Sequence, residues 1–429
     1  MRDLTQLSVT QAALEIAQGA LKPSTLLRAY LEKISQKEVE VNAFAFLAED
    51  AATEQAARQD GISPRGLLFG IPFAVKDLID TESVVTTYGS EIYNSNVPSS
   101  DAACVAQTKK QGAVFLGKTV TTEFAVFQPG KTANPHNLRH TPGGSSSGSA
   151  AAVAARMVPL AFGTQTAASI YRPASFCGVV GYKPTYGTIA RAGTKPLADS
   201  LDTIGVITNS VRDASLFASA SAGRNDLITK SNNDINKPRI GLCKTFEWHG
   251  AESETIMAIE SCASFLSGCG VRVVDCTLPE SFKLLLQAQI DIMARESAMA
   301  LSSEYLQHRT KLSVKLVDVI EQGLALTDAR LVEAYSIVEN CKAELKELFA
   351  NFDLLLAPAA RGEAPESLSS TGDPLFSRIW SALGNPGIVI PWSRGPKGLP
   401  VGVLFTAARF NDLLLLEAVD WVERQRGDF

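Results

Sequence analysis

Serine and glycine residues cluster at two places in the middle of the chain. The first cluster is Thr141-Pro-Gly-Gly-Ser-Ser-Ser-Gly-Ser149, and the second is Gly163-Thr-Gln-Thr-Ala-Ala-Ser-Ile-Tyr-Arg-Pro173. Paired glycines let the backbone enter positive φ and turn its N–H groups toward a ligand, and small side chains keep that approach open. Ser169 follows a run of small residues, so consecutive N–H groups could line a cavity beside its hydroxyl. Together these features indicate a nucleophile next to an oxyanion hole.

A glycine-rich loop that precedes a helix also suits phosphate binding. The alanine-dense run Ala150 to Arg156 predicts such a helix. The phosphate-loop pattern, however, ends in Gly-Lys followed by Ser or Thr, whereas Gly148 is followed by Ser149 and Ala150. The sequence therefore favours serine chemistry over nucleotide binding.

Lys76 lies inside an apolar run, Phe73 to Ile79, which is typical of a β-strand. Two interpretations of this stretch are open. In the first, the strand is at an edge and the lysine faces solvent or pairs with Asp77 or Asp80; this stretch alone favours it, since structural ion pairs are commoner than catalytic lysines. In the second, the lysine is buried and its lowered pKa lets it act as a base.

Composition excludes several classes of function. The chain has 429 residues, 45% of them hydrophobic, and a formal net charge of −5, which argues against a nucleic-acid partner. The N-terminus lacks a secretory signal, and no apolar run is long enough to span a membrane. The seven cysteines show no CxxC spacing and the four histidines no metal-ligand pattern, so we expect a cytoplasmic protein with reduced thiols and no metal.

Strands and helices alternate along most of the chain. We expect helices over 8–60, interrupted by a strand at 42–47, and Ser24 could cap one of these helices. A loop at 119–124 could face the serine segments, and a turn is expected at 179–184. A βαβ unit is expected over 239–274, followed by helices over 280–351. Further strands are expected at 353–358, 387–391 and 399–406, and a closing helix at 412–425. Because no convincing linker separates these elements, the sequence predicts a single α/β domain over residues 1–429 with a large mixed β-sheet core.

Three motifs together resemble the amidase signature family, in its stand-alone amidase branch. They are Gly70-Ile-Pro-Phe-Ala-Val-Lys-Asp77 and the two serine segments, the second running on through Cys177-Gly-Val-Val-Gly-Tyr-Lys-Pro-Thr185. The resemblance implies α-helices on both faces of the sheet and a Ser–cis-Ser–Lys triad with Ser169 as nucleophile, Ser145 as bridging serine and Lys76 as base. It also implies an oxyanion hole built from the backbone of Thr166, Ala167, Ala168 and Ser169, and no cofactor.

The sequence departs from the family pattern around the second serine segment. Gln165 stands where the family usually has aspartate, and Ala167 and Ala168 stand where it has one or two glycines. Tyr171 replaces the usual arginine, and Arg172 follows it. These changes leave the substrate open: an aliphatic or aromatic amide, a hydrazide or a urea-like compound. Candidate substrate contacts are Arg172 and His140.

The main functional prediction is hydrolysis of a carboxamide, or a related C–N acyl bond, through an acyl-Ser169 intermediate. The expected partner is a small-molecule amide substrate, without nucleic acid or membrane; a homodimer stays open. Two alternatives remain: a glutaminase (A-type) subunit of a tRNA-dependent amidotransferase, and a catalytically silent binding module of the same fold. The segment Thr371-Gly-Asp-Pro-Leu-Phe376, leading to Trp380, resembles free-standing amidases, and the intact triad argues against a silent module.

Overall fold

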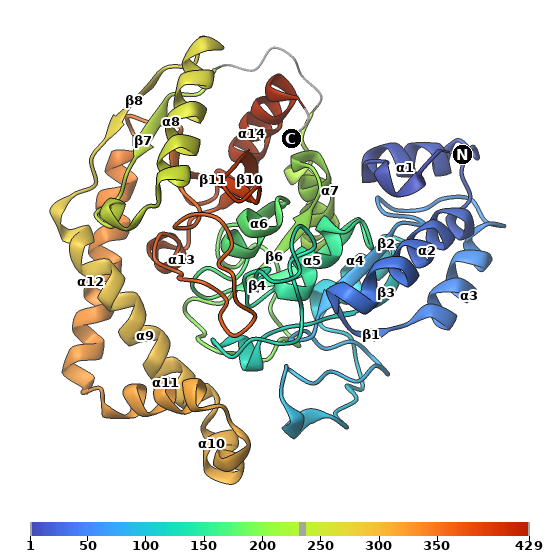
Figure 1. Cartoon of the computed structure of the whole chain (residues 1–429), viewed down its shortest axis with the longest axis horizontal. Helices are drawn as coiled ribbons and strands as arrows, with labels where there is room; N and C mark the ends of the chain where they lie inside the picture. The colour runs from blue at the N-terminus through green and yellow to red at the C-terminus, as the bar shows by residue number, and fades with distance from the viewer. Residues whose placement is uncertain (1, 231–236, 428–429) are drawn as a thin grey trace.

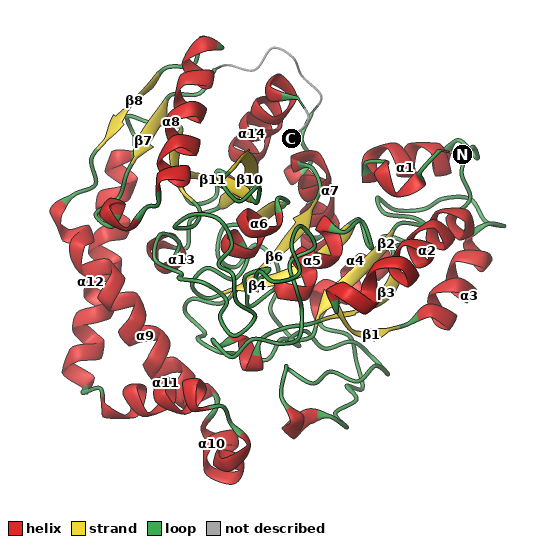
Figure 2. Ribbon diagram, in the orientation of Figure 1, coloured by secondary structure: helices red, strands yellow, loops and turns green. Residues whose placement is uncertain are grey.

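A mixed sheet of eleven strands crosses the computed structural model, which describes residues 2–230 and 237–427 (Figures 1 and 2). The strand order is β1-β3-β2-β4-β6-β5-β10-β11-β9-β7-β8. Strands from both halves of the chain therefore meet in one sheet. The strands are β1 Phe44–Leu47, β2 Pro72–Lys76, β3 Val114–Thr119, β4 Leu160–Gln165, β5 Val180–Lys183, β6 Thr203–Thr208, β7 Ile240–Cys243, β8 Val273–Cys276, β9 Leu354–Pro358, β10 Gly387–Arg394 and β11 Pro400–Ala407.

Parallel pairing occurs in two separate regions of this sheet. Strand β2 runs parallel to both β3 and β4, and β7 runs parallel to both β8 and β9. The strands between these regions, from β4 through β6, β5, β10 and β11 to β9, pair antiparallel. The sheet is therefore mixed, as the sequence predicted.

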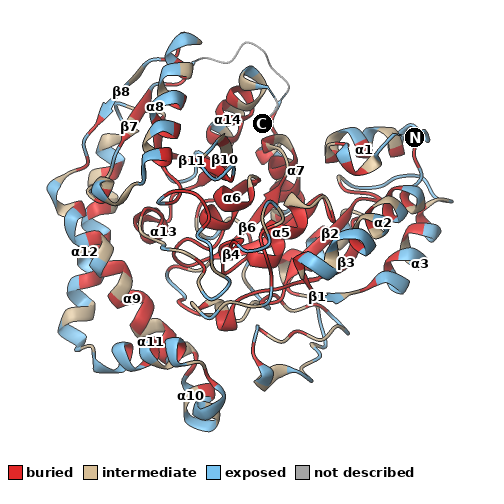
Figure 3. Cartoon of the chain, in the orientation of Figure 1, coloured by how far each residue is buried: buried red, intermediate tan, exposed pale blue. Residues whose placement is uncertain are grey.

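Helices cover both faces of the sheet, and the strands between them are largely buried (Figure 3). The apolar core on one face includes α5, α6, α9 and α11–α13, and the core on the other includes α1, α4, α7, α8 and α14. The α-helices are α1 Val9–Ala17, α2 Pro23–Val41, α3 Glu49–Gln59, α4 Ala103–Lys110, α5 Ser147–Ala154, α6 Tyr171–Cys177, α7 Val211–Ala222, α8 Ser253–Gly268, α9 Leu285–Ala300, α10 Ser302–His308, α11 Val314–Ala325, α12 Asp328–Leu348, α13 Arg378–Leu383 and α14 Asp412–Arg426. None of the helices in the described ranges is both long and apolar enough to cross a bilayer.

The predicted helices and strands are largely confirmed, with two exceptions. Ser24 does not cap a helix: α2 begins at Pro23, and the Ser24 hydroxyl donates to Asp60 instead. The turn predicted at 179–184 is wrong, because Val180–Lys183 forms the buried strand β5 between β6 and β10. A side chain at Gly181 in this strand would come within 2.5 Å of the Ala174 side chain, so the glycine allows close packing against α6.

Strand β4 and helices α6 and α7 have no counterpart in the sequence prediction. Strand β4 is buried along its whole length, and such a strand reads as a continuous apolar run without alternation. That run continues the apolar sequence of α5, so hydrophobicity alone does not separate the two elements. The pairing of residues 160–165 with β2 and β6 identifies this segment as a strand, which the local sequence pattern does not.

Candidate active site

Lys76 is fully buried at the end of β2, an interior strand between β3 and β4. The favoured interpretation of an edge-strand lysine is therefore wrong, as is a pairing with Asp77 or Asp80. The Nζ atom of Lys76 lies 2.7 Å from the Oγ atom of Ser145 and 2.7 Å from the Oγ1 atom of Thr164. Both contacts are neutral hydroxyls. Burial lowers the pKa of Lys76 to about 7, against an opposing effect of Asp202.

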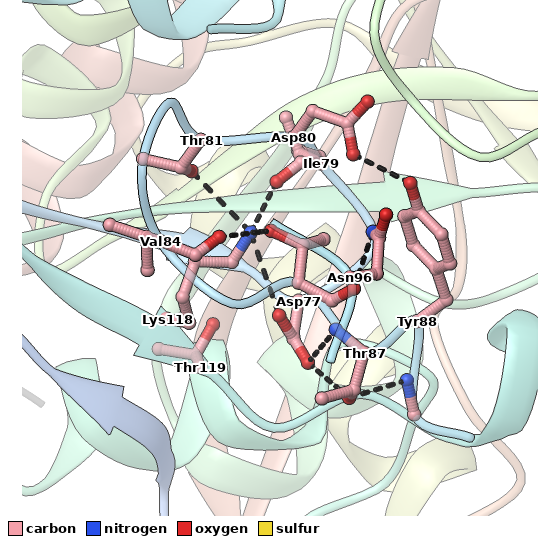
Figure 4. A network of polar contacts seen from close by, with 12 residues as sticks. Asp77, Ile79, Asp80, Thr81, Val84, Thr87, Tyr88, Asn96, Lys118 and Thr119 are labelled. Atoms are coloured by element: carbon pink, nitrogen blue, oxygen red, sulfur yellow. Dashed lines mark hydrogen bonds and ion pairs between the residues drawn. The ribbon is translucent and has the colours of Figure 1, made fainter. Parts of the chain in front are cut away.

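A second buried lysine, Lys118 on β3, is stabilised by an ion pair and hydrogen bonds (Figure 4). Its ammonium group lies 3.5 Å from the carboxylate of Asp77, and it donates to the carbonyl of Ile79 and to Thr86. Asp77 in turn accepts from the backbone and hydroxyl of Thr87, which ties the segment after β2 to the sheet. Burial lowers the pKa of Lys118 to about 8, and Asp77 opposes that shift.

The two lysines point to opposite faces of the sheet. In the pairing of β2 with β3, Lys118 is opposite Val75, and Lys76 is opposite Thr119. Because successive side chains on a strand alternate between faces, Lys118 shares the face of Val75 and Lys76 shares the face of Ala74. Lys76 thus lies on the face that carries α5 and α6, where both serine segments are found.

The loop Thr141–Ser149 brings Ser145 over Lys76. The peptide bond between Gly144 and Ser145 is cis, and α5 begins two residues later at Ser147. Both glycines are needed at this point. Gly143 has a φ of 82°, and a side chain on Gly144 would come within 2.7 Å of the Thr371 side chain. Gly143 therefore adopts the positive φ that the sequence predicted, whereas Gly144 is needed because it has no side chain.

Ser169 lies between β4 and α6 and lines a cavity together with Ser145. The cavity and its opening to solvent together contain about 350 Å³ of space not occupied by protein atoms. Thr166, Ala167 and Ala168 also line it, and their backbone N–H groups, like that of Ser169, have no hydrogen-bond acceptor within the described ranges. The structure therefore brings the four predicted oxyanion-hole residues to one wall, beside the predicted nucleophile. Lys76 lies behind Ser145 and does not line the cavity.

Ala167 and Ala168 fit the loop because neither has a positive φ, and their side chains narrow the cavity. Gln165 stands where the family usually has aspartate, and its side-chain amide makes three hydrogen bonds. Its Oε1 atom accepts from the N–H groups of Ile170 and Tyr171 at 2.9 and 3.0 Å, and its Nε2 atom donates to Ser381. The amide therefore fixes the start of α6 without a charge.

Arg172, and not Tyr171, occupies the cavity wall. Tyr171 is fully buried in the core, where its hydroxyl approaches Gly387. The Arg172 guanidinium donates to the carbonyls of Gly144 and Gly372 at 2.7 and 2.8 Å and to Thr371. No carboxylate among the described residues pairs with it, and its buried Nε atom has no partner there. Burial lowers the pKa of Arg172 to about 9, and Arg378 adds to that effect.

His140 is buried but lies apart from the cavity lining. One of its ring nitrogens, Nδ1, is 2.7 Å from the carbonyl oxygen of Ala364. The structure therefore places the two predicted substrate contacts differently: Arg172 is at the cavity, whereas His140 connects the serine loop to the segment after β9.

Several residues at this site were not identified from the sequence. Thr164 contacts Lys76, and Asp202 accepts from the Thr166 hydroxyl at 2.5 Å. Thr164 is on β4 and Asp202 is in the loop before β6, and the sequence assigned a role to neither. The rest of the cavity lining is mostly apolar and comes from distant segments: Thr122, Ala125, Val126, Phe127, Leu197, Met293, Thr371 and Pro374. Of these segments, the sequence indicated the loop containing Thr122 as one that could face this cleft.

A second cavity adjoins the first, and the two share Phe127, Met293 and Thr371. It encloses about 940 Å³, open to solvent, between α9, α11 and the loop before α13. In the described part of the chain, no three His, Cys, Asp or Glu side chains are grouped so that they could hold a metal ion.

The arrangement defines an enzyme class: a serine beside free backbone N–H groups, and a buried lysine in contact with a second serine. The family model described as Amidase matches residues 25–416, so the chain belongs to the amidase family, whose members hydrolyse carbon–nitrogen bonds of amides.

Individual relatives cover nearly the whole chain. The A-type subunit of the glutamyl-tRNA(Gln) amidotransferase of Koribacter versatilis is 30% identical over 98% of this chain and 98% of its own length. Among solved structures, the native peptide amidase of Stenotrophomonas maltophilia has a TM-score of 0.81 and 28% identity, covering 99% of this chain and 98% of its own. A chain from a vestigial protein complex, described in connection with the evolutionary origins of an s-triazine catabolic enzyme, has a TM-score of 0.88 and 28% identity, covering 98% and 99%. The chain is thus similar both to a peptide amidase and to one subunit of an amidotransferase.

Proposed function

We propose that this protein hydrolyses a small carboxamide, or a related C–N acyl bond, through an acyl-Ser169 intermediate without a metal ion. The observation that carries the proposal is the 2.7 Å contact between buried Lys76 and Ser145. A buried lysine whose neighbours are hydroxyls, and whose pKa is about 7, can hold a lone pair near neutral pH.

In the proposed mechanism, the Ser169 hydroxyl attacks the amide carbonyl while its proton passes to Ser145, and the Ser145 proton passes to Lys76. Such a relay suits the geometry, because Ser145 faces both the cavity and Lys76, whereas Lys76 has no hydrogen bond to Ser169 in the described chain. The carbonyl oxygen becomes an oxyanion, which the free N–H groups of the 166–169 loop stabilise. Lys76 returns the proton to the leaving amine, and water then releases the acid by the same route.

The cavity indicates the kind of acyl group. Its walls are mostly apolar and the two alanines narrow it, so we infer a compact acyl portion, while a larger substituent could extend into the adjoining cavity. Arg172 gives the first cavity one cationic group without a carboxylate partner, which favours a substrate with a polar carbonyl or anionic group near the scissile amide.

A panel of aliphatic, aromatic, hydrazide and urea-like compounds, assayed for release of ammonia or amine, tests this function. We expect at least one to be hydrolysed by the isolated protein after dialysis against a chelator, and none by Ser169→Ala. Activity lost on chelation and restored by a divalent ion would contradict the mechanism.

The glutaminase function remains a second candidate, because the relative from Koribacter versatilis is the A-type component of a tRNA-dependent amidotransferase. The two proposals differ in whether a partner is required. If this chain is a free-standing cytoplasmic amidase, glutamine is a poor substrate and activity does not need a second chain. Glutaminase activity that appears only in a complex with a co-purified chain would decide for the amidotransferase component.

A further inference from the structure

The carbonyl groups of the 166–169 loop are bound from behind by side chains of distant helices. In a trans peptide, the C=O of one residue and the N–H of the next point in opposite directions. The only cis peptide bond found in the described residues is Gly144–Ser145, so the peptide units of this loop are trans. A group that holds the carbonyl of Ala167 therefore also sets the direction of the Ala168 N–H.

Ser381, on α13, holds the Ala167 carbonyl. Its hydroxyl donates to that oxygen at 2.6 Å and accepts from the Nε2 atom of Gln165 at 3.0 Å. A serine hydroxyl has one proton, so a donor on Gln165 leaves that proton for a carbonyl. Of the two carbonyl oxygens in reach, that of Ala167 at 2.6 Å is much closer than that of Ser377 at 3.3 Å. Aspartate at position 165, which the family usually has, is an acceptor when ionised and would compete for the same proton. Glutamine at position 165 is therefore compatible with a Ser381 hydroxyl that donates to Ala167.

Gln289, on α9, holds the carbonyl of Thr166. Its Nε2 atom donates to that oxygen at 3.2 Å, while its Oε1 atom accepts from the Arg378 guanidinium at 2.5 Å. The contact with Arg378 orients the amide, because only the oxygen can accept from a guanidinium. The nitrogen of Gln289 is left facing Thr166. By the same peptide geometry, this contact directs the Ala167 N–H away from α9.

We propose that Ser381 and Gln289 are positioning residues that aim the N–H groups of Ala168 and Ala167 at the developing oxyanion, and that Gln165 sets the donor direction of Ser381. The inference rests on the proposed function, since it assigns these N–H groups to the oxyanion. None of the three side chains lines the cavity, so each acts through the loop. All three side chains are buried.

An interaction with the oxyanion exists only after attack on the carbonyl, so its loss lowers kcat and leaves KM nearly unchanged. Removing an oxyanion donor altogether typically costs about 10²- to 10³-fold in rate. Misdirecting one should cost less, and we expect about 10- to 100-fold for Ser381→Ala and for Gln289→Met. Ser381→Thr, which keeps the hydroxyl, should retain most of the wild-type rate.

The experiment uses two reactions of the same serine. The first is turnover of the best amide from the panel. The second is inactivation by a fluorophosphonate, in which a bond forms between the Ser169 oxygen and phosphorus, the bond from phosphorus to fluorine breaks, and fluoride leaves. Here the phosphoryl oxygen takes the place of the amide oxyanion, so the inactivation rate reports the same N–H groups without a known substrate.

Ser377→Ala is the matched control. Ser377 is buried beside the start of α13, one turn from Ser381, and its hydroxyl donates to the carbonyl of Ala359, away from the loop. It should label at the wild-type rate and melt within a few degrees of Ser381→Ala. Labelling of Ser381→Ala and Gln289→Met at the wild-type rate would overturn the proposed positioning.

The two proposals fail in different ways. A wild-type protein that labels at Ser169 but hydrolyses no amide refutes the amidase function, while slower labelling of Ser381→Ala still supports the positioning role. A wild-type Ser169 that does not react with the fluorophosphonate refutes both.

Discussion

Replacing Lys76 by methionine separates its role as a base from its effect on stability. With a pKa of about 7, wild-type kcat/KM should rise with pH and level off above neutrality. At pH 8 a lysine with that pKa is about nine-tenths neutral, whereas one with the ordinary pKa of about 10.5 is about 0.3% neutral. Burial therefore raises the fraction of available base about 300-fold at this pH.

The methionine variant keeps the volume of the side chain but cannot accept a proton. We expect a loss of roughly 10⁴-fold or more in kcat and no remaining ionisation near pH 7, since members of a triad act as a unit. Lys76→Arg should be as inactive, because a guanidinium stays protonated in this range. Lys118→Met is the control: it removes a buried lysine from the opposite face of the sheet and should keep the wild-type pH profile.

The same pKa predicts a change in stability. Between pH 7 and 10.5 the unfolded chain binds a proton at Lys76 that the folded chain does not, so the free energy of unfolding rises with pH over this window. From pH 7 to 9.5, wild type should gain about 3 kcal/mol relative to Lys76→Met, measured by urea unfolding. A difference that stays constant with pH, together with near-normal turnover of Lys76→Arg, would refute the neutral-base argument.

Three further outcomes are expected. Among the clustered serines, Ser169 alone should be labelled by a fluorophosphonate, because it alone follows the free N–H groups; peptide mass mapping checks this, and label on Ser145 would remove Ser169 from its role. Arg172→Met should lower kcat as well as raise KM, since Arg172 also holds the Gly144 carbonyl beside the bridging serine; steady-state kinetics that show an effect on KM alone would contradict this. Cys276, whose pKa is lowered by a hydrogen bond with Cys243, should react with iodoacetamide faster than fully buried Cys177, whose thiol pKa burial raises above its ordinary value; equal rates by mass spectrometry would contradict this.

The sequence predicted the mixed α/β fold and three motifs that meet in the structure: the two serine segments line one cavity, and Lys76 of the first motif contacts Ser145 behind it. Those motifs carry a strong signal only in combination, because a loop rich in glycine and serine is by itself most often a turn or a linker. The orientation of Lys76 did not follow from its own segment, since whether β2 is an edge or an interior strand depends on β4, more than 80 residues further on. Ser381 and Gln289 are still further along the sequence from the 166–169 loop that they contact. A serine or glutamine on a helix gives no signal of such a contact.

Comparison of Lys76 with Lys118, two of the three fully buried lysines in the described residues, shows what makes a base in this fold. Lys76 and Lys118 lie on neighbouring strands and are equally buried, so desolvation alone does not distinguish them. Lys118 has the carboxylate of Asp77 at 3.5 Å, which favours its ammonium form and opposes the effect of burial on its pKa. Lys76 has only the hydroxyls of Ser145 and Thr164 as direct partners. A hydroxyl can donate to a neutral amine or accept from an ammonium group, so both protonation states of Lys76 find partners, and its proton can be exchanged during a reaction. The identity of the partner, more than burial, therefore separates a lysine that can transfer a proton from one that holds a loop in place.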